Sequence, residues 1–209
     1  MQIGTSITVI TLSSAKSNKA TELIQNLTDG TYVHCGIHVG DGQVVDIVRS
    51  GVRLTLLDRF LDDYNYCAVS RCPGMNVYRE RAILRYAMLC VKKGVKYNYY
   101  DAALLPLREY RYIKSQYRIA FGKKYRPVRA SVKWMPRNRM FCSEFVVQCF
   151  KASGYIEKDD KYSVSHMCSP NWLAEEKTFE LVGYMSKLGL HAVDKKDPFL
   201  GSCGYILGK

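Results

Sequence analysis

Two short segments of this 209-residue chain carry side chains that could act together as a nucleophile and its base. The segment from His34 to Asp46 reads HCGIHVGDGQVVD and has the pattern of a β-hairpin that presents a histidine and an acid. The segment from Phe141 to Phe150 reads FCSEFVVQCF and places Cys142 at the start of an apolar helix. Unpaired N–H groups and the helix dipole favour a thiolate at such a position. A cysteine, a histidine base and an acid that orients the base are the parts of a cysteine hydrolase.

The hairpin must have one particular register for this chemistry. Apolar and polar residues alternate along 33–39, Gly40–Gly42 turns the chain, and 43–48 returns as the partner strand. Side chains alternate between faces, so Asp46 can reach His34 only if Asp46 lies opposite Gly36. A two-residue turn without a bulge would place Asp46 on the wrong face. The register is therefore a test of the assignment.

The remaining pattern predicts a mixture of strands and helices. Asn76 and Gly94 are expected to begin and end the helix at 77–93, and few helix signals occur at 122–136, which is expected to be a loop. The predicted strands are 7–12, 33–39, 43–48, 67–71 and 178–182, and the predicted helices are 15–27, 56–61, 77–93, a stretch after Tyr100, 142–152 and one that begins at Ser169-Pro170.

The order and spacing of the two motifs resemble the circularly permuted branch of the NlpC-type papain-like cysteine hydrolases, a branch that includes poxviral and lecithin:retinol acyltransferase-like members. In that branch a motif of the form H-x-G-I-x-x-G, followed by an acid or histidine, precedes the nucleophile motif C-S-E-(L/F)-V. The resemblance extends from about Gly4 to Val182 and includes S-G-V-R at 50–53, G-V-K-Y-N-Y at 94–99 and S-P-N-W-L at 169–173.

The resemblance implies an α+β fold with a papain-like (permuted NlpC-type) core, in which an antiparallel sheet packs against helices. It implies one domain over 1–209, with a basic insertion at about 108–139 and a glycine-spaced tail at about 183–209. It also implies Cys142 as nucleophile, His34 as general base and acid, and Asp46 as the group that orients the imidazole. The family often has a longer glutamate where Asp46 stands.

Each candidate residue also has a purely structural interpretation. Cysteine is among the most buried residue types, so Cys142 could be a core thiol, as Cys149 on the same helix is expected to be. His38 shares a strand face with His34 and is expected to form a polar wall. The helix dipole accounts for Glu144 in the first helical turn. A tyrosine could complete an oxyanion hole, and the sequence does not choose among Tyr97, Tyr99 and Tyr100.

The eight cysteines are scattered without tandem spacing and form no Cys-x-x-Cys pair, which favours reduced thiols and a cytoplasmic setting. His166 and Cys168 have no second ligand pair at zinc spacing, so we expect no metal and no cofactor. No segment approaches the roughly 20 apolar residues of a membrane span, and the N-terminus lacks the basic flank of a signal peptide.

The net charge of +12 is concentrated in one segment. Between Arg108 and Arg139 the chain has eleven basic residues and one acid, which gives a local charge of +10. Apolar residues recur at helical spacing over 107–121. This pattern is typical of a basic amphipathic helix at an anionic membrane surface, and also of a helix packed on its domain with a solvated cationic face, which we favour. No nucleic-acid recognition motif is present.

The sequence therefore predicts a cysteine peptidase or amidase-type hydrolase that cleaves an amide bond, in a peptide or an acylated amine, through an acyl-enzyme on Cys142. Two alternatives remain open. One is an acyltransferase that acts on lipid substrates. The other is a catalytically idle binding module that docks on an anionic membrane or nucleic acid. Oligomeric state cannot be read from the sequence.

Overall fold

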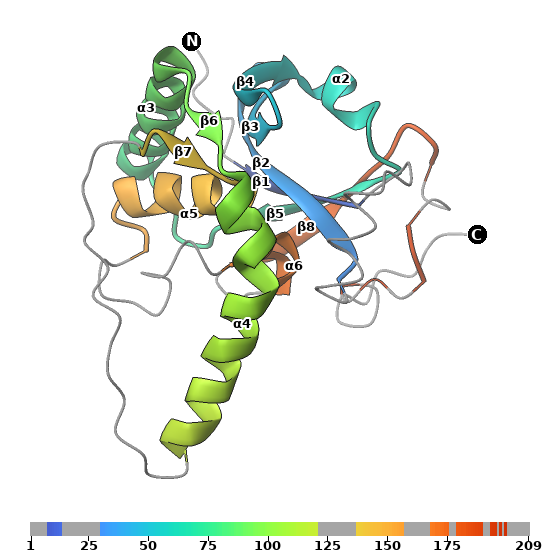
Figure 1. Cartoon of the computed structure of the whole chain (residues 1–209). Coiled ribbons are helices and arrows are strands. Elements are labelled where there is room, and N and C mark those ends of the chain that lie inside the picture. The colour runs from blue at the N-terminus through green and yellow to red at the C-terminus, as the bar shows by residue number, and fades with distance from the viewer. Residues whose placement is uncertain are drawn as a thin grey trace.

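The fold is a mixed arrangement of helices and antiparallel strands (Figure 1). The computed structural model describes residues 8–13, 30–120, 137–156, 168–175 and 179–189, together with 193–195, 197 and 199. This arrangement agrees with the α+β class predicted from the sequence. Among the described residues, no helix combines the length and the apolar content that a membrane-crossing segment requires.

A six-stranded antiparallel sheet forms the centre of the molecule, in the order β4-β3-β2-β1-β5-β8. Its strands, in chain order, are β1 (Thr8–Ser13), β2 (Tyr32–Gly40), β3 (Gln43–Val48), β4 (Gly51–Leu56), β5 (Cys67–Arg71) and β8 (Glu180–Met185). A separate pair of two-residue strands, β6 (Lys96–Tyr97) and β7 (Arg139–Met140), runs parallel. Strands β2, β3 and β4 follow one another as two hairpins, whereas β5 crosses over to pair with β1 and β8.

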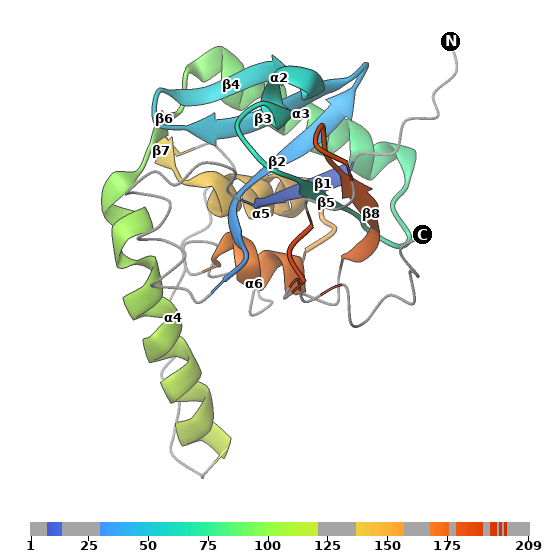
Figure 2. The ribbon, with the colours of Figure 1, turned by 90° about the vertical axis from the view of Figure 1, so that its right-hand side faces the viewer.

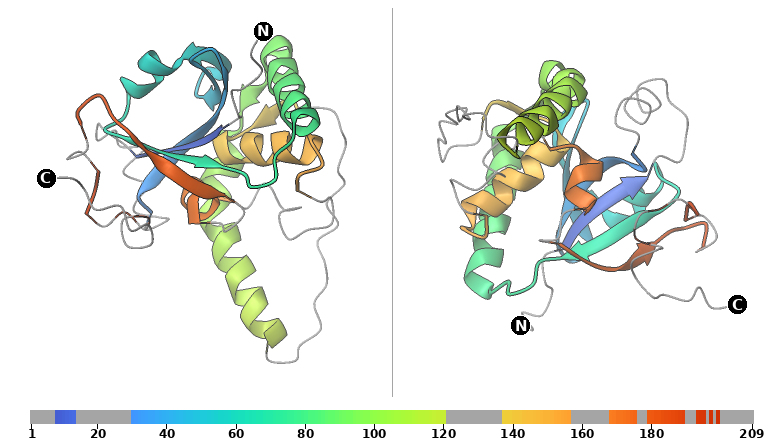
Figure 3. Two further views of the ribbon diagram at one scale, coloured as in Figure 1. Left: turned by 180° about the vertical axis from the view of Figure 1, so that it is seen from behind. Right: turned by 90° about the horizontal axis from the view of Figure 1, so that it is seen from below.

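Helices cover the sheet unequally. Helices α3 (Val77–Lys93) and α5 (Cys142–Ala152) pack together on one side, and the short α2 (Leu57–Leu61) lies on the other (Figure 1). Helix α6 (Pro170–Glu175) contacts β1 and β2 and lies below α5 in the view of Figure 2. Figure 3 shows from behind and from below that α3 and α5 lie on the same side of the sheet. The main core therefore forms between the sheet, α3 and α5.

Helix α3 begins and ends where the sequence predicts. The Asn76 side chain accepts a hydrogen bond from the Arg79 N–H, and Gly94 ends the helix in the left-handed conformation at φ 59°. Ile83, Ala87 and Cys90 form its buried face, together with Tyr86. The helix thus positions an apolar face against α5, as the 3.6-residue period requires.

Helix α4 (Tyr99–Ala120) extends away from the sheet (Figure 1). It begins at Asn98, whose side-chain oxygen accepts the Asp101 N–H. Leu107 and Tyr110 are 45% and 61% exposed. The favoured prediction, that the apolar positions of this basic helix pack on the domain, is therefore wrong for these two residues. The apolar positions at 112–120 have side chains outside the described set, and the predicted loop at 122–136 also lies outside it.

Most other predicted elements are present with small shifts in their bounds. The strands at 7–12, 33–39, 43–48 and 67–71 and the helices at 56–61 and 142–152 correspond to β1, β2, β3, β5, α2 and α5. The strand predicted at 178–182 is found at Glu180–Met185. The helix predicted at 15–27 lies outside the described residues, and the sequence pattern did not predict β4, β6 or β7.

The buried Asp197 anchors the segment that follows β8. Its carboxylate accepts hydrogen bonds from the hydroxyls of Tyr32, Tyr66 and Tyr184, at 2.7, 2.9 and 2.8 Å. Tyr32 begins β2, two residues before His34. Through these bonds, a residue near the C-terminus holds the start of the strand that carries His34.

Candidate active site

A β-bulge sets the register of the hairpin that carries His34 and Asp46. Asp41 and Gly42 form the two-residue turn, at φ 50° and 64°, as a type I′ turn requires. Gly40 pairs with Gln43, but His38 pairs with Val44, so the register shifts by one residue between His38 and Gly40. Gly36 therefore lies opposite Asp46. This is the register that the assignment of Asp46 requires.

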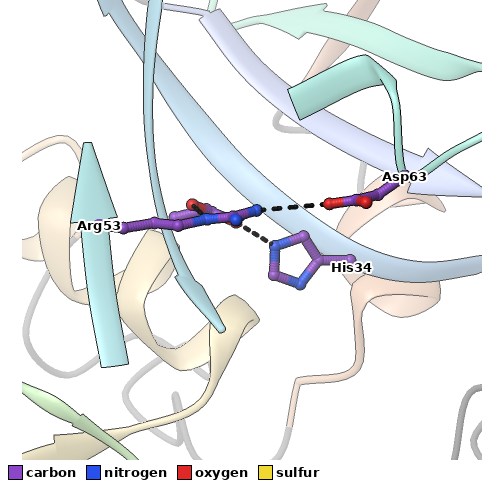
Figure 4. Close-up of polar contacts among 4 residues, drawn as sticks. His34, Arg53 and Asp63 are labelled. Atoms are coloured by element: carbon purple, nitrogen blue, oxygen red, sulfur yellow. Dashed lines mark hydrogen bonds and ion pairs between the residues drawn. The ribbon is translucent and has the colours of Figure 1, made fainter. Parts of the chain in front are cut away.

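The buried carboxylate of Asp46 connects His34 to a cation. Its Oδ2 atom lies 2.8 Å from Nε2 of His34. Arg53 donates to the same carboxylate from Nε at 2.9 Å and from a terminal nitrogen at 3.2 Å. Figure 4 shows His34 and Arg53 at this point of the sheet, with Asp63 on the far side of the guanidinium. The nearest nitrogen of Arg53 and the nearest oxygen of Asp63 are 3.8 Å apart. One carboxylate thus orients the histidine and is itself held by two hydrogen bonds from the arginine.

Sequence reasoning did not identify Arg53 as a member of the site. The signal was present: Val48 pairs with Gly51 across a two-residue turn, and that register places Arg53 directly opposite Asp46. Facing positions on neighbouring strands have their Cβ atoms about 5 Å apart, which is within reach of a long basic side chain. A register argument for β3 and β4 would therefore have found this residue.

Cys142 is the first residue of α5, and its surroundings leave the start of this helix free of a side-chain cap. Phe141 occupies the N-cap position and makes no side-chain cap hydrogen bond. Glu144, three residues later, accepts the Phe141 N–H, and the Ser143 hydroxyl donates to the Cys168 carbonyl at 2.5 Å. Ser143 and Glu144 therefore help to fix the helix start at Cys142.

The Cys142 sulfur contacts both His34 and its neighbour Cys35. The Cys35 thiol, the His34 ring and the Cys35 N–H all lie close enough to this sulfur to lower its pKa. Residues 34 and 35 lie beyond the last pair of β2 with β3, which is Gly36–Asp46. Helix α5 contacts β2, and this packing brings Cys142 to His34 from more than a hundred positions away in sequence.

The electrostatics of the site favour a thiolate–imidazolium pair. The hydrogen bond from the Cys35 thiol and the contact with His34 lower the pKa of Cys142 well below that of a free thiol, against the opposing effect of burial. Burial alone would lower the pKa of His34, but the hydrogen bonds to Asp46 and Cys142 raise it. Burial would raise the pKa of Asp46, and its bonds to His34 and Arg53 lower it instead. All three shifts favour the charged forms.

Aromatic side chains line the histidine and the sulfur. The Tyr64 ring stacks on the His34 ring at a centroid distance of 5.8 Å and an interplanar angle of 5°, with Phe60 tilted beside it at 6.1 Å. Among the three candidate oxyanion tyrosines, Tyr97 lies close enough to Cys142 for the negative charge there to raise its pKa. Tyr99 donates to the Arg49 carbonyl, and Tyr100 is 79% exposed. Of the three, Tyr97 is therefore the one beside the sulfur.

Cys149, His38 and Glu144 were also considered from the sequence, and each of these residues is at least partly buried. Cys149 is fully buried in the core, as expected. His38 is partly buried, and burial lowers its pKa. Glu144 is fully buried and receives a hydrogen bond from Arg137 at 3.0 Å, so the helix dipole is not its only partner. In the part of the chain that the structure describes, no group of three or more histidine, cysteine or acidic side chains is arranged to bind a metal ion.

Comparisons with known proteins bear on the fold alone. No family model matches the sequence, and no curated protein matches it. Among solved structures, the chain is similar to the crystal structure of metalloprotein yiiX from Escherichia coli O157:H7, described as DUF1105. The two are 15% identical, with a TM-score of 0.54, over 87% of this chain and 97% of that one. At this identity the likeness shows a shared fold.

Proposed function

We propose that this protein is a cysteine hydrolase of the circularly permuted NlpC-type papain-like class, which cleaves an amide bond in a peptide or an acylated amine. One observation carries the proposal: Nε2 of His34 lies 2.8 Å from the Asp46 carboxylate, and the same ring is close enough to Cys142, at a helix start, for each to shift the pKa of the other. The antiparallel sheet against α5 and the order of the two motifs also support it.

The geometry supports the following sequence of steps. The Cys142 thiolate attacks the carbonyl carbon, and the N–H groups of the first turn of α5 stabilise the oxyanion that forms. Nε2 of His34 is hydrogen-bonded to Asp46, so Nδ1 is the ring nitrogen that exchanges a proton with the reacting groups. The imidazolium donates that proton to the leaving amine, and the acyl group stays on sulfur. His34 then takes a proton from water, which hydrolyses the thioester.

Arg53 and Asp46 have supporting roles in this mechanism. Asp46 stabilises the imidazolium that exists while Cys142 is a thiolate, and Arg53 holds Asp46 in place through two hydrogen bonds. The stacked Tyr64 ring keeps the imidazole plane fixed and limits the access of water.

Trapping the acyl-enzyme tests the proposal. The protein would be mixed with an activated acyl ester, quenched in acid and analysed by intact and peptide mass spectrometry. We expect one acyl group on the Cys142 peptide and its loss over time in water. Cys142→Ala should remove the adduct, and Cys149→Ala, a buried cysteine on the same helix, is the matched control. An adduct on another residue, or none, would contradict the hydrolase. Transfer of the acyl group to an added amine or lipid, in preference to water, would identify the acyltransferase instead.

Helix α4 supports a second activity, docking on an anionic lipid surface. Leu104, Leu107 and Tyr110 are exposed on a helix that extends away from the sheet, and Arg111 is exposed beside them (Figure 2). Exposed apolar groups next to cations match the chemistry of an anionic bilayer interface, where each basic residue contributes on the order of 1 kcal/mol. The +10 charge over 108–139 adds long-range attraction.

Liposome co-sedimentation tests this docking. Binding should require anionic lipid, weaken as salt is added, and fall when Arg111, Lys114 and Arg118 are all changed to glutamine. The triple change Arg79→Gln, Arg81→Gln and Arg85→Gln on α3 is the matched control for loss of charge. Equal sedimentation with neutral and anionic vesicles would exclude the docking, and release by added RNA would favour a nucleic-acid partner.

A further inference from the structure

The sulfur of Cys142 has a second thiol as its direct neighbour. The Cys35 side chain and backbone N–H both lie within hydrogen-bonding range of that sulfur, close enough to lower its pKa. Cys35 and Cys142 belong to the same core cluster, between β2 and the start of α5. A thiol already in hydrogen-bond contact with a thiolate needs only a small approach to form a disulfide. No step of the hydrolytic mechanism uses the Cys35 side chain as a reactant.

The two thiols differ in charge and in access. Cys142 is favoured as a thiolate, whereas burial and the nearby Cys142 charge raise the pKa of Cys35 and keep it protonated. Cys142 is 4% exposed and Cys35 is fully buried. A small oxidant would therefore react with Cys142 first, and Cys35 would be present as the adjacent thiol to react with the product.

We propose that Cys142 and Cys35 form a reversible disulfide when the protein meets a peroxide, which makes the pair an oxidative modification site. In the first step the Cys142 sulfur attacks one peroxide oxygen, the O–O bond breaks, and sulfenic acid and one water form after uptake of a proton. In the second step the Cys35 sulfur attacks the sulfenic sulfur, an S–S bond forms, the S–O bond breaks, and a second water leaves. The peroxide is reduced by two electrons, and the two thiols are oxidised.

The pairing has a chemical consequence for the site. A sulfenic acid without a neighbouring thiol can be oxidised further to a sulfinic acid, which dithiols do not reduce. Cys35 intercepts the sulfenic acid, so the oxidised protein keeps a form that a dithiol can restore. Cys168 lies near Cys35, close enough for its charge to affect the Cys35 pKa, and it is the competing partner that the experiment must separate.

Peptide mapping of the full-length protein tests the pair. The reduced protein would be treated with one equivalent of hydrogen peroxide, its free thiols alkylated in denaturant, and its non-reduced digest analysed by mass spectrometry. We expect a linked peptide pair that joins Cys35 to Cys142, and full return of both thiols after dithiothreitol. Given a second equivalent of peroxide, which oxidation of one thiol to a sulfinic acid requires, Cys35→Ala should instead accumulate sulfinic acid on Cys142 that dithiothreitol does not reverse, whereas the wild type should keep the disulfide. Cys149→Ala, another buried cysteine of the same core, should behave as the wild type.

The wild-type map alone can overturn the proposal. A link that joins Cys35 to Cys168, or Cys142 to any cysteine other than Cys35, would contradict it. Sulfinic acid on wild-type Cys142 in place of a disulfide would also contradict it, as would thiols that stay unmodified. The experiment uses no substrate, so its failure would leave the proposed hydrolase untouched, and failure of the acylation test would leave this result standing.

Discussion

Asp46 is a fully buried carboxylate whose charge is compensated by His34 and Arg53. An ionised carboxylate in this position would cost several kcal/mol without partners, because it has lost its water. Here the histidine supplies one partner and the arginine supplies two hydrogen bonds. At the residue scale, the charge on Asp46 therefore favours the imidazolium form of His34, which together with the Cys35 thiol favours the thiolate form of Cys142.

Asp46→Asn should make the thiolate of Cys142 harder to form. Loss of the negative charge destabilises the His34 imidazolium, and an opposite charge at such a distance typically contributes 1 to 3 pKa units. We expect the midpoint of the pH profile for Cys142 alkylation to move up by about 1 unit. Asp63→Asn is the control, because Asp63 contacts the same arginine at the exposed rim, at 3.8 Å. An unchanged midpoint in a folded Asp46→Asn variant would show that Asp46 does not act on this proton.

At the element scale, the first turn of α5 holds two ionisable groups in opposite states. Cys142 is favoured as an anion, whereas burial raises the pKa of Glu144, two residues later, to about 7. One oxygen of Glu144 accepts from Arg137, and the other has no hydrogen-bond partner among the described residues. The surroundings of the helix start therefore favour the negative charge of Cys142 and disfavour the negative charge of Glu144.

The raised pKa of Glu144 predicts a pH dependence of stability. The unfolded carboxyl loses its proton near pH 4.3 and the folded one near 7, so the folded state binds more protons between these values. Stability should therefore fall as pH rises through this range, by up to about 3 kcal/mol. Urea unfolding at pH 5 and pH 8 should show this loss in the wild type and much less of it in Glu144→Gln. Glu80→Gln, in the first turn of α3, should keep the wild-type difference, and equal differences in all three proteins would refute the prediction.

Particular elements show how far the sequence predicts the structure. Helix α3 was predicted to the residue, because its cap, its apolar period and its terminal glycine are local signals. For β2 and β3, the sequence showed which register the assignment of Asp46 requires. It did not show that the hairpin has this register, because the bulge at Val39 depends on how the strands pair. Arg53 was missed because the sequence pattern did not predict β4, the strand that places this residue opposite Asp46. Strands β6 and β7 have two residues each, too few to show a period.

At the scale of the whole molecule, the candidate site depends on segments that are distant in sequence. The histidine, its acid and the arginine come from three neighbouring strands, and the cysteine arrives on a helix after α4. Asp197 adds a further long-range connection, since three tyrosines from β2, β8 and the start of β5 donate to its carboxylate. The sequence tail gave no pattern that predicted this contact, because a hydrogen bond between residues 165 positions apart leaves no local signal.

Asp197→Ala should destabilise the whole fold. It would leave three tyrosine hydroxyls without their acceptor, and each buried unsatisfied group costs roughly 1 to 3 kcal/mol. We expect a loss of about 3 kcal/mol or more in the free energy of unfolding, measured by urea denaturation at pH 7. Lys195→Ala, at an exposed neighbour in the same segment, should change it by less than about 0.5 kcal/mol. Similar values for the two variants would show that the tyrosine cluster does not stabilise the protein.

Site-resolved alkylation at pH 6 tests the central claim, that Cys142 is a thiolate maintained by His34. The protein would receive a brief, substoichiometric dose of iodoacetamide, and each cysteine peptide would be quantified by mass spectrometry. Each unit by which the pKa of a thiol falls raises its thiolate fraction about tenfold at this pH, so Cys142 should be labelled about tenfold or more faster than any other cysteine. His34→Ala should remove this advantage, and His38→Ala, on the same strand face, should keep it. Preferential labelling of another cysteine, or labelling of Cys142 that is indifferent to His34→Ala, would contradict the account.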